Sequence, residues 1–289
     1  MLKFLLTICL VITAITLPAT YAESFDFDDT EVFFFSQKEV EVPIIMYHLI
    51  TERSKLIGKY GVTPAEVEDD LVFLKQNGYT TVVMQDLINF VKHGEKLPQK
   101  AIMLTFDDGN ASDFTYLLPL LRKHEMKAVL AIMGDVIDRD TKTVEENPKS
   151  KVPYLTWPQV RELHESGLCE IQSHGYNVHG KGGSSNRHGE SADAYHKRLT
   201  ADLTKLQDAC KLHLNYTPNT FIYPLGAVGK NSRKIIEDME MVGSLGCEEG
   251  INIVRPGDID CLFEMHRFNR PSGKPVGGIL ERMEKMRRK

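Results

Sequence analysis

Hydrophobic and polar positions follow two periods that alternate along most of the chain. Short apolar runs, typical of buried strands, alternate with stretches in which apolar residues recur every three or four positions, as on one helix face. The predicted strands lie near residues 39–47, 79–83, 100–106, 127–133, 169–173, 220–223 and 242–245. The predicted helices lie near residues 63–76, 85–92, 114–124, 156–166, 191–212 and 231–239. This alternation predicts an α/β fold with a parallel sheet, and its six or seven units favour a barrel.

Two of the predicted helices begin with a clear local signal. Thr63-Pro64-Ala65-Glu66 and Thr156-Trp157-Pro158-Gln159 each combine an N-cap threonine, a proline in the first turn and a Glu or Gln at the third helical position. The segments 134–152 and 180–190 lack such a pattern, and we expect both to be loops beside a groove. Beyond Glu249 the pattern weakens until a basic, amphipathic stretch ends the chain.

The composition is that of an ordinary globular protein. The chain has 289 residues, of which 42% are hydrophobic and 26% charged, enough for a large hydrophobic core. A net charge of −5 and a pI near 6.1 give no indication of nucleic-acid binding and no electrostatic attraction to anionic membranes.

The first residues predict a secretory signal peptide. Lys3 precedes an apolar run over residues 4–17, and small residues lead to a cleavage site after Ala22. An uncleaved anchor is the alternative, although the run is shorter than the ~20 residues of a spanning helix. Because no other segment could span a membrane, we expect a secreted, periplasmic or cell-surface protein that begins with an acidic tail over residues 23–38.

The cysteines that remain after cleavage leave the disulfide pattern open. Four cysteines in an oxidising compartment permit two disulfides in three connectivities, but Cys169 lies in a predicted strand and is equally well explained as a buried thiol. The four are Cys169, Cys210, Cys247 and Cys261.

Candidate chemical groups follow several of the predicted strands. Asp107 and Asp108 end one apolar run, and two adjacent carboxylates in a poorly solvated place favour a bound cation or a shared proton. His174 ends another strand, with His179 five residues later. One Asp and two His make a three-ligand set that leaves a coordination position open, as in catalytic zinc sites. His48 also follows a strand, and barrel enzymes place their active sites at the carboxyl ends of strands.

These two motifs resemble those of a known family. Thr105-Phe106-Asp107-Asp108-Gly109, followed by Ser173-His174 and then His179, resembles the polysaccharide deacetylases of carbohydrate esterase family four, over roughly residues 42–269. The spacing of five between the histidines is similar to that of the poly-N-acetylglucosamine deacetylase branch. The resemblance implies a distorted (β/α) barrel of about seven parallel strands. It also implies a divalent metal, zinc with cobalt or nickel as alternatives, held by Asp108, His174 and His179, with Asp107 as catalytic base.

The resemblance leaves the general acid open between two histidines. Many relatives use a late histidine in a Leu-x-His motif, and His266 is the nearest counterpart here. His48 is favoured because a histidine at this position lies at the active site in the same branch.

A third motif, residues 220–226, resembles the segment that forms one wall of the family's groove. It implies that Tyr223, Pro224 and Leu225 bind substrate. The sequence departs from the family at Thr220, where an arginine that steadies the catalytic base is common, and Arg267 is a candidate replacement. Two further departures are Leu225, where an aromatic residue is usual, and Gly175, where the family has Ser or Thr.

The resulting hypothesis is a secreted, metal-dependent hydrolase that removes N-acetyl groups from N-acetylhexosamine units of a polysaccharide. The glycan would be poly-N-acetylglucosamine, peptidoglycan of the cell wall, or a chitin-like polymer, and the sequence does not distinguish them. We expect a catalytic domain over residues 39–275 and a basic C-terminal helix over residues 276–289. The alternatives are hydrolysis of another amide or an O-acetyl ester, and an inactive glycan-binding relative. The sequence gives no indication of the oligomeric state.

Overall fold

The computed structural model describes residues 37–180 and 183–288. The predicted signal peptide (1–22) and the predicted tail up to residue 36 lie outside the described residues.

Strands and helices alternate through most of the described chain. The strands are β1 (Val40–Glu41), β2 (Ile44–Tyr47), β3 (Leu49–Ile50), β4 (Gly61–Val62), β5 (Thr80–Thr81), β6 (Ala101–Asp108), β7 (Ala128–Ile132), β8 (Cys169–Ser173), β9 (Thr220–Ile222), β10 (Gly243–Leu245), β11 (Ile253–Val254) and β12 (Phe268–Asn269). The α-helices are α1 (Pro64–Gln76), α2 (Met84–His93), α3 (Leu118–His124), α4 (Gly134–Glu146), α5 (Trp157–Glu165), α6 (Ala192–Leu214), α7 (Ser232–Asp238) and α8 (Val276–Arg287).

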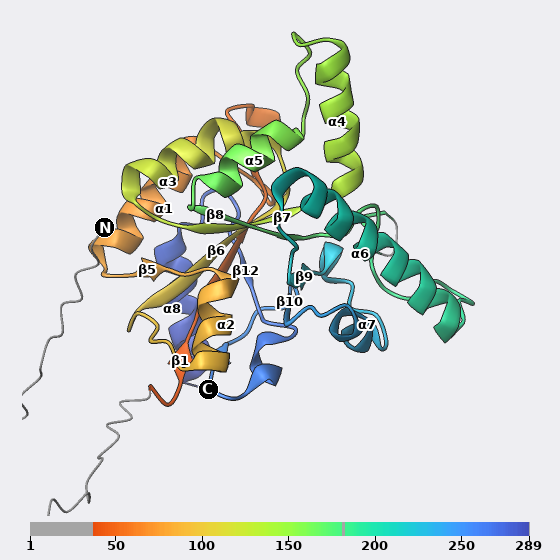
Figure 1. Ribbon diagram of the computed structural model, residues 1–289. Coiled ribbons are helices and arrows are strands. Elements are labelled where there is room, and N and C mark those ends of the chain that lie inside the picture. Colours follow the sequence, from red (N-terminus) through yellow and green to blue (C-terminus); the bar gives the residue numbers. More distant parts are fainter. Residues whose placement is uncertain (1–36, 181–182, 289) are drawn as a thin grey trace, which may run out of the picture. The chain divides into compact units, whose positions relative to one another are not determined.

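The main sheet is parallel and has the strand order β10-β9-β8-β7-β6-β2-β12, with β5 paired to β6. The strands curl into a distorted (β/α) barrel of about seven parallel strands (Figure 1), so the predicted fold class is confirmed. The carboxyl ends of all these strands therefore lie at one edge.

Successive residues of β6 point to opposite sides of the sheet, as a strand requires. Leu104 and Phe106 belong to a core shared with α1, α3, α5 and α8. Met103 belongs to a second core, which α2 covers from the other side. Both cores are fully buried, so β6 is a rigid central strand, and Figure 1 shows α1, α3 and α5 along one side of it.

Three local predictions need correction. The expected loop at 134–152 is wrong, because residues 134–146 form α4, in which Val136 and Ile137 are buried although most positions are polar. The expected strand at 39–47 is divided by Pro43, whose ring removes a backbone donor, and its first part pairs with β11 instead. The central strand also continues through Asp107 and Asp108 rather than ending before them.

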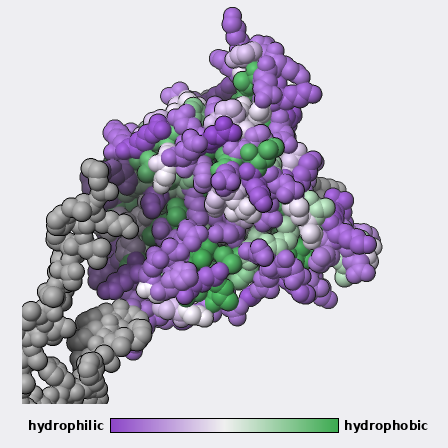
Figure 2. Space-filling model, in the orientation of Figure 1, coloured by the Kyte–Doolittle hydropathy of each residue, from purple (hydrophilic) through white to green (hydrophobic). Residues whose placement is uncertain are grey.

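Other open points are resolved by the described residues. Cys169, Cys210, Cys247 and Cys261 are all free thiols. Among the described helices, none has the length and apolarity that crossing a membrane requires. The face in Figure 2 is mostly hydrophilic, with small, separate hydrophobic patches.

The predicted capping signals are confirmed at both helices. The Thr63 hydroxyl accepts the Glu66 N–H at 3.1 Å, and the Glu66 carboxylate accepts the Thr63 N–H at 2.9 Å. At α5 the Gln159 side chain accepts the Thr156 N–H at 3.0 Å. Each helix therefore begins at a fixed residue.

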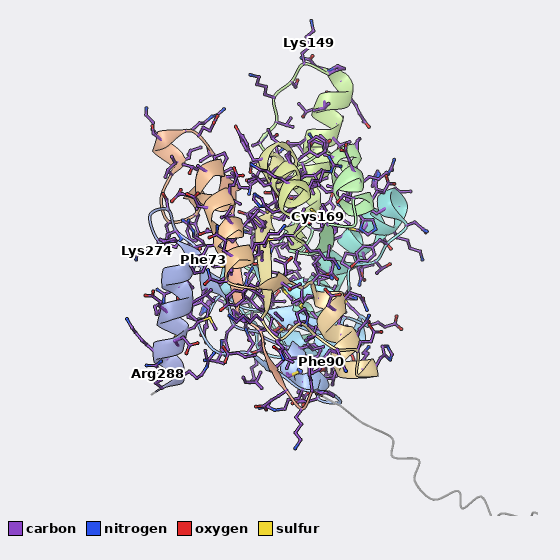
Figure 3. The ribbon with its side chains drawn as sticks, turned by 90° about the vertical axis from the view of Figure 1, so that its left-hand side faces the viewer. Phe73, Phe90, Lys149, Cys169, Lys274 and Arg288 are labelled. Atoms are coloured by element: carbon purple, nitrogen blue, oxygen red, sulfur yellow. The ribbon has the colours of Figure 1, made fainter. Side chains whose placement is uncertain are left out.

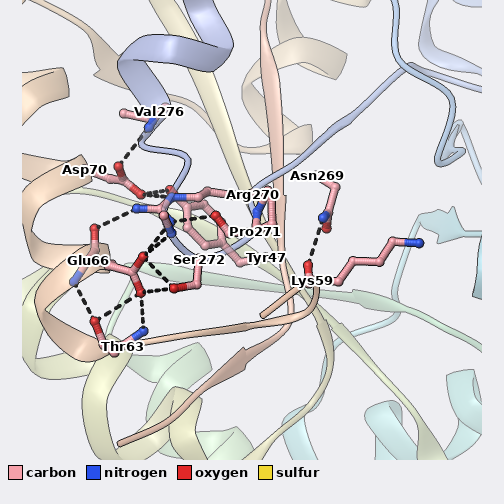
Figure 4. A network of polar contacts seen from close by, with 11 residues as sticks. Tyr47, Lys59, Thr63, Glu66, Asp70, Asn269, Arg270, Pro271, Ser272 and Val276 are labelled. Atoms are coloured by element: carbon pink, nitrogen blue, oxygen red, sulfur yellow. Dashed lines mark hydrogen bonds and ion pairs between the residues drawn. The ribbon is translucent and has the colours of Figure 1, made fainter. Parts of the chain in front are cut away.

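The buried carboxylate of Asp70 ties α1 to the C-terminal segment (Figure 4). It accepts hydrogen bonds from Arg270 Nε at 2.7 Å, Tyr47 Oη at 2.9 Å and the Val276 N–H at 2.9 Å. Val276 is the first residue of α8. A segment with no clear sequence pattern is thus held by charge-assisted bonds to a helix 200 residues earlier in the chain.

Glu66, one turn before Asp70, is the second anchor of this segment. Besides capping α1, it accepts the Ser272 hydroxyl at 2.9 Å, the Gly273 N–H at 2.7 Å and the Arg270 guanidinium at 3.2 Å. Burial alone would raise the pKa of Glu66, but these hydrogen bonds lower it to about 2. We call Glu66, Asp70, Arg270 and Ser272 the anchor network.

The low pKa of Glu66 makes the anchor network sensitive to acid. Because its folded pKa lies below the usual 4.5, ionised Glu66 stabilises the fold above that pH, and this contribution is lost as the pH falls from about 4.5 to about 2. We expect Glu66→Gln to lower the free energy of unfolding by about 2–3 kcal/mol at pH 7, with a difference that shrinks toward pH 2.5. Urea unfolding across this range measures it, with Asp69→Asn on the exposed side of α1 as control. A pH-independent difference would contradict the assignment.

Gln172 closes a gap in the sheet. The strands β8 and β9 share only the pair Ser173–Phe221. Next to it, the fully buried Gln172 side chain accepts the backbone N–H groups of Asn219 at 3.1 Å and Thr220 at 2.9 Å. A side chain thus takes the place of ladder hydrogen bonds.

Replacing Gln172 would leave those two donors unpaired. We expect Gln172→Leu to lower the free energy of unfolding by about 2–4 kcal/mol, since each unsatisfied buried group costs about 1–3 kcal/mol. Urea unfolding measures the loss, and Gln76→Leu at the exposed end of α1 is the matched control. Equal stability of the two variants would show that the bridge contributes little.

Candidate active site

The predicted ligands Asp108, His174 and His179 lie together at the carboxyl edge of the sheet. Their ligand atoms are all within 4.8 Å of one another. Asp108 Oδ1 is 3.6 Å from His174 Nε2 and 3.2 Å from His179 Nε2. Asp108 ends β6, while His174 follows β8 and His179 comes from the next loop. The strands β6 and β8 lie on either side of β7 and run in the same direction, so their carboxyl ends share one edge. Residues up to 71 positions apart, from Asp108 to His179, meet there.

The surroundings of these three residues fit a metal ion. His174 Nδ1 lies 2.8 Å from the Ile222 carbonyl oxygen, which requires the proton on Nδ1 and leaves the Nε2 lone pair facing Asp108. Burial lowers the pKa of His174, so its imidazole is in the neutral form that binds metals. Asp108 Oδ1 is buried and, within the described chain, has no hydrogen-bond donor. One carboxylate and two imidazoles are a donor set typical of zinc.

Two residues with positive φ angles shape this cluster. Asp108 has φ 80°, a conformation that is rare for residues other than glycine and that marks local strain. Gly175 has φ 83°, and a Cβ there would lie 2.3 Å from Val178. The family's Ser or Thr would not fit at this position, so this departure reflects the local turn.

Asp202 of α6 holds the turn that carries His179, and no pattern in the sequence predicted this role. Its carboxylate accepts the backbone N–H groups of Tyr176 at 2.7 Å and Asn177 at 2.8 Å. The turn that begins at Gly175 and leads to His179 is therefore held by a helix that comes later in the chain.

Asp107 faces the opposite side of the strand and forms a buried ion pair with Arg267. The guanidinium donates to both carboxylate oxygens, at 2.7 and 2.9 Å, and the two residues are 1% and 0% exposed. Burial would raise the pKa of Asp107, but the positive charge of Arg267 lowers it to about 2, so the carboxylate is ionised. Thr220 stands where the family commonly has an arginine. In this chain Arg267 provides the positive charge beside Asp107 instead.

The two candidate acids are in different places. His48 follows β2, and its Nε2 is 4.0 Å from Asp107 Oδ2. His266 lines a separate cavity, where its ring packs against Gly250. Only His48 therefore lies beside Asp107.

A cavity of about 450 Å³ opens over these groups. Six predicted site residues line it: His48, Asp107, Asp108, His174, His179 and Leu225. Five further lining residues were not predicted: Met46, Lys59, Tyr60, Cys247 and Asn269. Met46 lies in β2 and Asn269 in β12, Lys59 and Tyr60 directly precede β4, and Cys247 follows β10. None of the five belongs to a predicted motif.

Of the three predicted substrate-binding residues in the third motif, only Leu225 lines this cavity. Tyr223 is fully buried, with its hydroxyl 3.0 Å from Ser232 Oγ, and Pro224 is buried as well. Leu225 is 62% exposed and adopts φ 59°, a strained conformation that turns its side chain outward.

Comparison with known proteins agrees with this geometry. Residues 94–243, just over half of the chain, match the model of the polysaccharide deacetylase family. The chain belongs to this family.

Individual relatives support the assignment to the polysaccharide deacetylases. The chain is 27% identical over 220 residues to a poly-beta-1,6-N-acetyl-D-glucosamine N-deacetylase of Escherichia coli, covering 69% of this chain but only 32% of that protein. It is 25% identical over 261 residues to a putative polysaccharide deacetylase of Bacillus subtilis, covering 89% and 82% of the two chains. The chain thus spans about a third of the length of the Escherichia coli deacetylase.

Solved structures show the same fold. A de-N-acetylase from Aggregatibacter actinomycetemcomitans superposes with a TM-score of 0.70 at 23% identity, covering 83% of this chain and 99% of the other chain. IcaB from Ammonifex degensii superposes with a TM-score of 0.65 at 21% identity, covering 80% and 93%.

Replacing Asp202 tests the predicted metal site while leaving Asp108, His174 and His179 in place. We expect Asp202→Ala to weaken zinc binding by about tenfold, because groups around the ligands commonly contribute 10- to 100-fold to metal affinity. Competition with a chromophoric chelator measures the affinity. Asp208→Ala, at an exposed position on the same helix, is the control. Unchanged affinity in Asp202→Ala would mean that the turn does not depend on this carboxylate.

Proposed function

We propose that the chain is a metal-dependent hydrolase that removes N-acetyl groups from N-acetylhexosamine units of a polysaccharide. Family membership supports a polysaccharide deacetylase, and the Escherichia coli relative is named for poly-N-acetylglucosamine. The observation that carries the proposal is the cavity in which the Asp108, His174 and His179 cluster lies beside the Asp107–Arg267 pair and His48.

Asp108, His174 and His179 would hold the metal, zinc or alternatively cobalt or nickel. When bound, a divalent cation there lowers the pKa of a water molecule and polarises the acetyl carbonyl. The three side chains come from a rigid strand end and a fixed turn, so they need little rearrangement to hold it.

Asp107 acts as the base in this proposal. Arg267 keeps its carboxylate ionised and fixes both oxygens, so Asp107 is ready to take a proton from the attacking water. His48, whose Nε2 lies 4.0 Å from Asp107 Oδ2, then gives a proton to the leaving amine. The departing nitrogen needs such a proton because an amide anion is a very poor leaving group.

The cellular setting is part of the same proposal. A leader over residues 1–22 would deliver the chain to the periplasm or outside the cell, where its polysaccharide is found. The deacetylase domain would comprise residues 39–275, and α8 packs its apolar side into the same core. Poly-N-acetylglucosamine is the first glycan to test, with peptidoglycan and chitin-like polymers as alternatives.

Asp107→Asn tests the chemistry directly. We expect the zinc-loaded variant to release acetate from soluble N-acetylglucosamine oligomers about 10²- to 10⁴-fold more slowly, the range for loss of a general base. Removal of metal from the wild type by a chelator should abolish release, and added zinc should restore it. Asp69→Asn, on the exposed side of α1, controls for the charge change.

The alternatives give different outcomes in the same experiment. Release from simple acetyl esters but from none of the three glycans would favour another acetylated substrate. Zinc binding without turnover of any acetylated compound would favour an inactive glycan-binding relative. Full activity in Asp107→Asn would refute the assigned base.

A further inference from the structure

A second open cavity adjoins the candidate active site. It has a volume of about 430 Å³, close to the 450 Å³ of the first, and Lys59 and Asn269 line both. Lys274, just before α8, and Arg282, within α8, also line the second cavity. The two cavities adjoin at these shared residues, one beside Asp107 and Asp108 and the other beside α8, and we call them together the groove.

The wall between the two cavities is a fixed loop, residues 58–61. Asn269 Nδ2 donates to the Lys59 carbonyl oxygen at 2.9 Å, as Figure 4 shows. The Ser272 N–H donates to the Gly58 carbonyl oxygen at 2.9 Å. Ser272 belongs to the anchor network, so buried charges indirectly hold this surface loop in place. A loop built in this way is preorganised for a ligand.

Tyr60 gives the first cavity an apolar surface. Its ring is 49% exposed and lies 4.7 Å from the His48 ring, centroid to centroid. Leu225, 62% exposed, is the other large apolar side chain in this cavity that remains open to solvent. An aromatic ring held open to solvent in a polar site is suited to packing against the apolar face of a sugar ring.

The second cavity carries uncompensated positive charge. Arg282 pairs with Glu249 at 2.6 Å. The ammonium groups of Lys59 and Lys274, by contrast, have no carboxylate partner among the residues that the structure describes; Lys59 lies 4.8 Å above the Tyr60 ring. A deacetylated sugar unit bears an ammonium at neutral pH, and these lysines would repel it.

We propose that this groove binds two consecutive sugar units of the polysaccharide. The reacting unit packs against Tyr60, and the neighbouring unit lies in the second cavity, between Lys59 and Lys274. That cavity accepts the neighbour while it is acetylated and disfavours it after deacetylation, so the products would carry spaced rather than adjacent amines. The inference rests on the proposed function and names how its substrate is held.

Binding by the zinc-loaded Asp107→Asn protein tests the groove without turnover. Calorimetric titration with N-acetylglucosamine and its dimer should show that the dimer binds at least about tenfold more tightly. Tyr60→Ala should weaken dimer binding about tenfold, and Tyr60→Phe should restore it, since only the ring is required. Equal affinity for one and two units, or no effect of Tyr60→Ala, would overturn the proposal.

A charge reversal tests the second cavity separately. The starting protein should prefer the fully acetylated dimer over dimers with one glucosamine by about threefold to fivefold, the size of a surface charge interaction. Lys274→Glu should abolish or invert this preference. Lys149→Glu is the matched control, because Figure 3 shows Lys149 at the end of the loop after α4 and Lys274 at the start of α8. If both variants keep the preference, the charge assignment is wrong.

Failure of the groove and failure of the proposed function give different results. If the protein releases acetate and binds the dimer, but neither the release nor the affinity depends on oligomer length, only the groove proposal is refuted. If the wild type neither binds nor hydrolyses any N-acetylglucosamine oligomer while retaining zinc, this glycan and the groove built for it are both refuted.

Discussion

The buried ion pair between Asp107 and Arg267 is the interaction on which the site depends. A carboxylate that is 1% exposed would be neutral or would unfold its surroundings without a partner, and the guanidinium supplies both charge and hydrogen bonds. Arg267 also donates to the Gly246 carbonyl oxygen at 2.6 Å and to Thr105 Oγ1 at 3.1 Å. One side chain therefore joins the ends of β6, β10 and β12. Removing either member of such a pair typically costs about 3–5 kcal/mol, because the other charge stays buried.

The same pair places two adjacent acids in different surroundings. Residues that follow each other in a strand point to opposite sides, so Asp107 meets Arg267 while Asp108 meets the two imidazoles. The positive φ of Asp108 turns the chain at this point. Arg267 supplies the counter-charge of Asp107, and the two imidazoles remain the neighbours of Asp108.

The surface of the site is built from a part of the chain that is far away in sequence. The loop at residues 58–61 is held by Asn269 and by Ser272 of the anchor network. Hydrogen bonds to the carboxylates of Asp70 and Glu66, rather than apolar packing alone, determine where the C-terminal segment runs. This arrangement places Lys59 and Tyr60 in one cavity with His48 and Asp107, without a long rigid element beneath them.

The sequence by itself determined the elements whose causes are local. The capping residues Thr63 and Thr156 fix helix starts because their hydrogen bonds reach only three residues along the chain. Strand and helix periods predicted the parallel barrel, and Asp108 and His174 were expected at one face because both follow predicted strands. The polar α4 was missed because only a narrow apolar stripe marks it as a helix.

Only the tertiary structure decided which residues surround Asp108 and His174. Gln172, Asp202 and Asn269 act through partners dozens to hundreds of positions away, and no periodicity records such contacts. Arg267 was a candidate in the sequence, but its pairing with Asp107 depends on how β12 lies against β2. The candidate metal ligands can be recognised from short sequence motifs, because they follow predicted strands. The walls of the groove cannot be recognised in this way, since they form where separate segments pack together.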